Sequence, residues 1–159
     1  YWLLHLSKHG RARDEMARLH WDKSNIFVHP GDAGFNALGF DPNVDPNQKT
    51  LEFDFGSDAR TDSLAAAVDQ LPRMIRDDAA DVTTAVTIGD LFRANCNETP
   101  LTFDLVSEAV IKLRDEYGEI DIFTDAGRPR PTAKTLGWSD RVRGRQQKTF
   151  MRLLGQSAR

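Results

Sequence analysis

The sequence contains little of what catalytic and metal sites are usually built from. Cys96 is the single cysteine among 159 residues, which excludes an internal disulfide and any zinc site made of several cysteines. Because a chain without disulfides suits a reducing compartment, we expect a cytoplasmic protein. No apolar run approaches the roughly 18 residues of a membrane-spanning helix, and the first residues lack the features of a signal peptide. We therefore expect no contact with a membrane.

The motifs of common enzyme families are missing as well. The chain has no G-x-S-x-G elbow, Walker loop, H-E-x-x-H pair or G-x-G-x-x-G turn. Cys96 lies between Asn95 and Asn97, without a neighbouring base that would activate it as a nucleophile. His5 and His9 would share a helical face, but no further ligand completes a metal site. We expect a chain without catalytic residues of its own, without a metal ion and without a cofactor.

Acidic residues are scarce at the C-terminal end of the chain. The last 32 residues hold nine Lys and Arg against one acid, Asp140, whereas the first 127 hold twelve basic and 23 acidic residues. A chain of net charge −3 therefore combines a body near −11 with a basic end near +8. Such asymmetry indicates an external polyanion or acidic partner, or a basic end that docks on the protein's own acidic body.

The first 60 residues are predicted to form two segments. Residues 1–6 are an apolar run typical of a buried strand, and Ser7 is predicted to cap a helix over residues 8–21. Strand followed by helix is half of a parallel α/β unit, so residues 1–23 would end an α/β domain; an all-helical start is the alternative. Residues 24–60 are rich in Gly, Pro and Asp and are predicted to be an interdomain linker. Within it, residues 51–55 alternate as a half-buried strand.

Residues 61–159 begin with a pattern of two helices. Thr61 is predicted to cap the first helix, which Pro72 should kink or shorten because proline lacks the backbone donor. Thr87, followed three residues later by an acid, loosely fits a capping box and opens a short helix over residues 88–94.

A longer helix and a β-ribbon follow. Thr102 is predicted to cap a helix over residues 103–117 that ends at Gly118. Residues 119–124 alternate as a strand with Ile120 and Ile122 on one face. A turn and a proline-broken basic segment lead to residues 139–148, a final strand or helix.

This order of elements, with a helix, a short helix, a turn, a longer helix, a strand, a loop and a strand, is that of a winged helix. The expected fold class is α+β, with a C-terminal winged-helix-like domain at residues 61–159 preceded by the strand–helix end of an α/β domain. An unrelated small α+β domain is the alternative. Trp138 is predicted to be a core aromatic residue under the wing, although it could also stack on a base.

The predicted binding residues are basic and lie in the wing and beyond it. In DNA-binding winged helices the second helix of the turn enters the major groove. Here that helix is net negative at its exposed positions, so phosphates would repel it. Those positions are Asp104, Glu108, Asp115 and Glu116 against Lys112 and Arg114. Nucleic acid would instead be contacted at its phosphates, with little sequence reading. The candidate residues are Arg128, Arg130, Lys134, Arg141, Arg143, Arg145 and Lys148.

Several short segments carry a family resemblance. The opening YWLLHLSKHG, followed by Met16 and Trp21, resembles a segment of the type Y-Y-L-L-H-L-T-x-H-P, with Gly10 at the position of the proline. The pieces LGFDP at residues 38–42, Asn47-Gln48 and L-x-F at residues 51–53 add to the match. The chain thus resembles the C-terminal region of the three-Cys-motif partner proteins. The resemblance implies a preceding methyltransferase-type α/β domain and a partner protein with three cysteines. It carries over no catalytic residue.

Three functions remain open from the sequence. The first is a non-catalytic module that binds nucleic acid through the basic wing and tail. The second is a protein-interaction domain that docks a partner enzyme such as a three-Cys-motif protein. The third is the C-terminal part of a methyltransferase-like enzyme whose active site lies outside this chain. Salt dependence distinguishes the first from the second, because phosphate contacts weaken steeply with salt.

Overall fold

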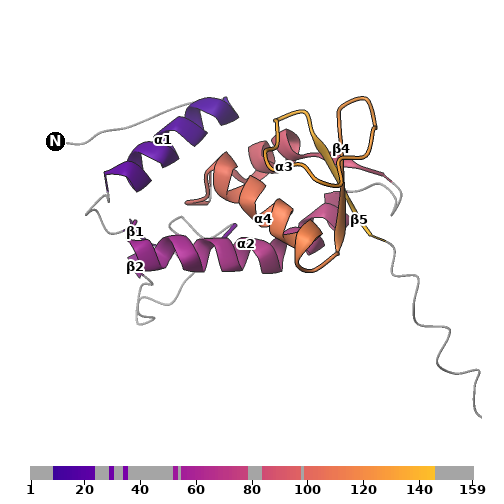
Figure 1. Cartoon of the computed structure of the whole chain (residues 1–159). Helices are drawn as coiled ribbons and strands as arrows, with labels where there is room; N and C mark the ends of the chain where they lie inside the picture. The colour runs from indigo at the N-terminus through magenta and orange to yellow at the C-terminus, as the bar shows by residue number, and fades with distance from the viewer. Residues whose placement is uncertain are drawn as a thin grey trace, which may run out of the picture.

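Four helices and two small antiparallel sheets make up the part of the chain described by this computed structural model (Figure 1). That part comprises residues 9–23, 29–30, 34–35, 52–53, 55–78, 84–97 and 99–145. The elements in chain order are α1 (Gly10–Asp22), β1 (His29–Pro30), β2 (Glu52–Phe53), α2 (Ser57–Asp78), β3 (Val86–Thr87), α3 (Ile88–Asn95), α4 (Phe103–Asp115), β4 (Ile120–Phe123) and β5 (Arg141–Gly144). The expected α+β class is confirmed.

The larger sheet has three strands in the order β3–β5–β4, so the last strand of the described chain lies in the middle. β5 pairs antiparallel with both neighbours, and Ile122 stands opposite Val142 on the buried face. The predicted alternation is confirmed, because Ile120 and Ile122 are both buried. The opposite face of the sheet pairs Asp121 with Arg143 and Phe123 with Arg141. We refer to residues 119–145, which contain β4 and β5, as the ribbon.

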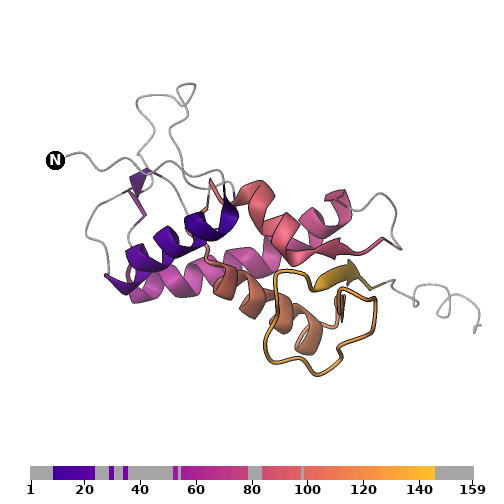
Figure 2. The same ribbon diagram turned by 90° about the horizontal axis from the view of Figure 1, so that it is seen from above.

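A single hydrophobic core joins the helices to the sheet. α2 packs along α4, and both contribute fully buried apolar side chains that meet the inner face of the sheet. Both views place the three-stranded sheet toward one end of the molecule and α1 toward the other (Figures 1 and 2). The largest of the buried side chains are Phe92, Leu71, Ile75, Ile88, Leu91, Leu101, Leu113, Ile120, Val106 and Val110.

Two of the predicted helix caps, Thr87 and Thr102, are confirmed. The Thr87 hydroxyl accepts a hydrogen bond from the Asp90 N–H at 3.0 Å and so caps α3. It also donates to the Asp90 carboxylate, whereas in a capping box that carboxylate would accept from the Thr87 N–H. The Thr102 hydroxyl accepts from the Leu105 N–H at 3.2 Å at the start of α4. α4 ends two residues before its predicted end, and Gly118, with φ of 66°, turns the chain toward β4.

Other predicted helix boundaries are wrong. α2 begins at Ser57, so Thr61 lies inside it rather than at its cap, and the predicted linker is shortened. α2 also continues beyond Pro72 to Asp78. Leu71 and Ile75 are buried in the core on either side of this proline, and their packing holds the helix together where one backbone hydrogen bond is missing.

The N-terminal segment differs in part from the expectation. α1 is capped by His9, whose Nδ1 accepts from the Arg11 N–H at 3.4 Å, rather than by Ser7. The predicted strand over residues 1–6 lies outside the described residues. In the predicted linker, β1 pairs antiparallel with β2, which falls within the strand expected at residues 51–55. α1 contacts the start of α4 and the turn before it, and these contacts join it to the domain that follows.

Candidate functional site

The N-terminal end of α4 is occupied by a side chain of α1. Asp14 Oδ1 accepts a hydrogen bond from the Phe103 N–H at 2.7 Å, and Asp14 is only 3% exposed. Burial raises the pKa of the Asp14 carboxyl above its ordinary value, against the lowering effects of the Phe103 N–H and of Arg18. A helix N-terminus attracts anions, and here the attracted anion is the protein's own carboxylate.

Further contacts hold α1 over the turn between α3 and α4. Arg13 Nε donates to the Cys96 carbonyl at 2.9 Å, and Trp21 Nε1 donates to the Pro100 carbonyl at 2.8 Å. Arg18 lies 3.2 Å from Asp14 and 3.2 Å from Asp104. The turn that would lead a recognition helix into a groove is therefore covered by α1.

The predicted core role of Trp138 is confirmed by its ring contacts. Its ring stacks on Phe103 with centroids 4.3 Å apart and meets Phe92 edge to face at 5.4 Å. Arg11 of α1 lies over the same ring at 5.5 Å. The loop that carries Trp138 is thereby fixed to both α4 and α1.

The exposed side of α4 is acidic and partly paired with other elements. Glu108 lies 2.8 Å from Arg60 of α2, and Asp104 is paired with Arg18. The prediction that Arg114 is exposed on this helix is wrong, because its side chain is 5% exposed. Arg114 instead donates to the carbonyls of Arg130 at 3.1 Å and Ala133 at 2.8 Å, which ties the ribbon to α4.

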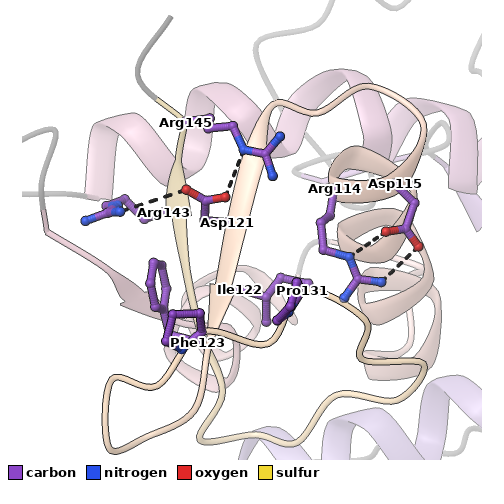
Figure 3. Close-up of a pocket in the computed structure, with 9 residues that line it drawn as sticks. Arg114, Asp115, Asp121, Ile122, Phe123, Pro131, Arg143 and Arg145 are labelled. Carbon is purple, nitrogen blue, oxygen red and sulfur yellow. Dashed lines mark hydrogen bonds and ion pairs between the residues drawn. The ribbon is translucent and has the colours of Figure 1, made fainter. Parts of the chain in front are cut away.

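Two arginines meet one acid on the outward face of the sheet. Asp121 Oδ1 accepts from Arg145 Nε at 2.8 Å, and its second oxygen lies 3.9 Å from Arg143 (Figure 3). The guanidinium carbon of Arg143 lies 4.9 Å from the centroid of the Phe123 ring. Arg143 is thus oriented by an aromatic face and a carboxylate without a short hydrogen bond to either.

These side chains border a cleft of about 430 Å³, which we call the ribbon cleft. Arg114 and Asp115 form a bidentate pair at its edge, with N–O distances of 2.6 and 2.8 Å. The hydrogen bond from Arg114 lowers the pKa of the Asp115 carboxyl below its ordinary value. The ribbon cleft is lined by Arg114, Asp115, Asp121, Ile122, Phe123, Pro129, Pro131, Arg143 and Arg145.

The remaining predicted site residues are dispersed. Arg130 forms an ion pair with the buried Asp140 inside the ribbon, and its Nη2 donates to the Thr135 carbonyl at 3.2 Å. Arg128 and Lys134 are exposed, and neither forms an ion pair within the described ranges. Arg141 is half-buried on β5. Lys148 lies outside the described residues.

The spacing of Arg128, Arg130, Arg141, Arg143 and Arg145 predicts one exposed positive patch, distinct from the acidic face of Asp104, Glu108 and Asp115, and the structure differs from this expectation. The backbone of Phe123 in β4 forms an isolated antiparallel β-bridge with Pro129 on one side and pairs with Arg141 of β5 on the other. β4 therefore separates the segment around Arg128 from β5. Asp115 lines the same cleft as Arg143 and Arg145, so acidic and basic surfaces adjoin rather than lie apart. As far as the structure describes it, up to Arg145, the charge of the basic end is therefore divided between internal ion pairs and a smaller exposed set.

Sequence reasoning missed Asp121 and Phe123 as members of this site. The signal for them was present, because both alternate with buried isoleucines and so must share the outward face of β4. The role of Arg114 had no comparable local signal, since the carbonyls that it binds lie in the following loop.

The comparisons with known proteins assign no family. No family model, curated protein or solved structure matches the chain at a significant level. Among the described residues, no three His, Cys, Asp or Glu side chains are gathered as a metal site would require. In the same part of the chain, no helix has both the length and the apolar character needed to cross a membrane. The resemblance to the three-Cys-motif partner proteins remains a prediction.

Proposed function

We propose that residues 57–145 form a winged-helix domain that binds the phosphate backbone of nucleic acid through its ribbon. The order of elements supports this fold: a helix and a strand, two helices, and then two strands that pair as an antiparallel ribbon. The first strand, β3, joins the sheet by pairing with the last strand, β5.

The observation that carries the proposal is the arginine row along β5. Arg141 and Arg143 share its outward face, and Arg145 follows at the end of the strand. Alternate residues of a strand lie about 6.6 Å apart, so the guanidinium groups are spread along an extended line. The side chains of Arg143 and Arg145 are 36% and 49% exposed, which leaves their outer donors accessible. Guanidinium donors suit phosphate oxygens.

The helices support contact at the backbone rather than at base edges. The N-terminal end of α4 is filled by Asp14, and its exposed side carries Asp104 and Glu108. Because both acids are paired with arginines, this side of α4 carries little net charge to attract phosphates in a groove. We therefore propose that this domain binds without strong sequence preference.

The test is binding of the full chain to fluorescently labelled duplex and single-stranded oligonucleotides, followed by anisotropy over a range of salt concentrations. The logarithm of the association constant should fall linearly with the logarithm of the salt concentration. The slope should be about −0.9 per phosphate contact for a duplex and about −0.7 for a single strand. The double variant Arg143→Ala/Arg145→Ala should bind more weakly and flatten the slope by about one to two units.

A matched control removes two arginines elsewhere. Arg73 and Arg76 are exposed on α2, so Arg73→Ala/Arg76→Ala changes the net charge equally without touching the ribbon. Arg141 is left intact because its Nε is buried and its loss would disturb packing. Equal weakening by both double variants would refute a ribbon site. Absence of binding at low salt would instead favour a protein-docking domain.

A further inference from the structure

The ribbon cleft has an apolar floor that backbone contact alone does not require. Ile122, Phe123, Pro129 and Pro131 all line it. In Figure 3, Ile122 and Pro131 lie between Arg143 of β5 and Arg114 of α4. A phosphate group gains nothing from an aromatic ring and two prolines. A planar and largely apolar group such as a nucleobase does gain from them, because it buries its faces against such surfaces.

Arg143 and Phe123 together form a stacking surface. The guanidinium of Arg143 lies over the Phe123 ring at 4.9 Å and makes no hydrogen bond within the described residues. Guanidinium planes stack on aromatic and nucleobase faces, and their edge donors stay free to bind oxygen atoms. Arg143 is therefore suited to contact a base through its plane and a phosphate through its edge.

The charges of the cleft leave one cation to be neutralised by a ligand. Arg114 and Asp115 neutralise each other through two short hydrogen bonds. Asp121 offsets one of the two arginines Arg143 and Arg145, to both of which it is paired. One positive charge remains beside the apolar floor, which matches the charge of one phosphodiester. A volume of about 430 Å³ lies within the range of small-ligand pockets.

We propose that the ribbon cleft holds one nucleotide of a single-stranded nucleic acid, with its base against Phe123 and Arg143 and its phosphate on Arg143 and Arg145. This inference rests on the proposed function and narrows its substrate class from nucleic acid in general to unpaired strands. A duplex is disfavoured because its bases are already stacked and paired, so the apolar floor would stay unfilled.

The test compares three ligands of equal length on the full chain: labelled oligothymidylate, an abasic strand with the same backbone, and a duplex. Oligothymidylate should bind roughly tenfold tighter than the abasic strand, at the lower end of what base–aromatic stacking contributes. Phe123→Leu keeps an apolar side chain but removes the ring, so it should abolish that ratio while leaving the salt slope unchanged. Tyr117→Leu is the matched control, because Tyr117 is 57% exposed and lies outside the cleft lining.

A second variant acts in the opposite direction. Asp121→Asn removes the carboxylate that competes with a phosphate for Arg143 and Arg145, so it should tighten oligothymidylate binding several-fold at low salt. Melting temperatures of all variants establish that the fold is retained before their affinities are compared.

The outcomes separate the two proposals. Equal affinity for oligothymidylate and the abasic strand, or an unchanged ratio in Phe123→Leu, overturns the nucleotide cleft and leaves backbone binding by the ribbon intact. Tighter binding to the duplex than to oligothymidylate overturns it as well. No binding to any of the three strands at low salt overturns both proposals together. An acidic peptide that binds where these strands do not would assign the cleft to a protein partner and also overturn both.

Discussion

Replacement of Asp14 should reveal how strongly α1 is attached to the rest of the protein. Asp14→Ala leaves the Phe103 N–H buried without an acceptor and removes the ion pair with Arg18. An unsatisfied buried donor costs about 1–3 kcal/mol, and a hydrogen bond to a charged group contributes about 1.5–3 kcal/mol. We therefore expect Asp14→Ala to lower the free energy of unfolding by about 2–3 kcal/mol, or roughly 5–10 °C in melting temperature.

Two companion variants make this prediction specific. Asp14→Asn keeps an oxygen that accepts from the Phe103 N–H and avoids the burial of a charge, so its cost should stay below about 1 kcal/mol. Glu15→Ala removes a neighbouring acid from the exposed side of α1 and should be close to neutral. Urea unfolding followed by circular dichroism gives all three values. If Asp14→Ala and Asp14→Asn lose equal stability, the hydrogen bond to Phe103 is not what holds α1 in place.

The stability difference between the wild type and Asp14→Asn should depend on pH, because the pKa of Asp14 is raised, chiefly by burial. A raised pKa means that the folded state favours the protonated carboxyl. Its contribution to stability is therefore greatest below the ordinary value of 3.8 and declines as pH rises through the folded-state value. On acidification toward that ordinary value, the wild type should gain stability relative to Asp14→Asn. A loss instead would mean that the ion pair with Arg18 outweighs the burial of the charge.

Three further predictions concern packing, the ribbon anchor and thiol reactivity. Gly89→Ala would place a Cβ 2.6 Å from the Trp138 carbonyl oxygen and should cost about 1–3 kcal/mol in urea unfolding, whereas Gly144→Ala meets no atom within 4 Å and should cost far less. Arg114→Lys keeps the charge but loses the planar set of donors, so it should lower the melting temperature and raise proteolysis in the ribbon. Burial raises the pKa of the Cys96 thiol, so alkylation by iodoacetamide should be slow in the folded protein and fast in urea; rapid alkylation of the folded protein would contradict this burial.

Elements with strong local signals were predictable from the sequence. α3 and α4 each begin directly after a threonine whose hydroxyl caps the helix, and their apolar spacing fixes which face is buried. The alternation over β4 correctly placed Ile120 and Ile122 together. In each case the determining interactions lie within a few residues along the chain, which is the range that pattern reasoning can read.

Elements that depend on distant partners were not predictable. β3 is two residues long, too short for any periodicity, and it is a strand because it pairs with β5. The course of α2 through Pro72 depends on burial against α4, which outweighs the local tendency of proline to end a helix. A charged residue such as Arg114 is usually exposed on a helix, and only the fold brings the carbonyls of the ribbon to its guanidinium.

The candidate site shows the same division. The basic residues cluster near the C-terminal end of the sequence, yet the sequence could not show which of them the fold neutralises. Asp140 forms an ion pair with Arg130 inside the ribbon, and Asp121 lies directly opposite Arg143 on the neighbouring strand. Over the described part of the basic end, counting charge along the chain therefore overstates the cationic surface that a partner meets.

This neutralisation changes what kind of recognition the ribbon is suited for. A broad positive patch would favour non-specific attraction to any polyanion, with affinity set by the number of phosphates contacted. The ribbon instead combines one net positive charge in the cleft with an aromatic ring, two prolines and a stacked guanidinium. With few phosphate contacts available there, a larger share of the binding free energy must come from burial of apolar surface, which salt does not screen. A salt slope set by the few phosphate contacts at Arg143 and Arg145, combined with strong dependence on the presence of bases, is therefore the behaviour that this arrangement of residues favours.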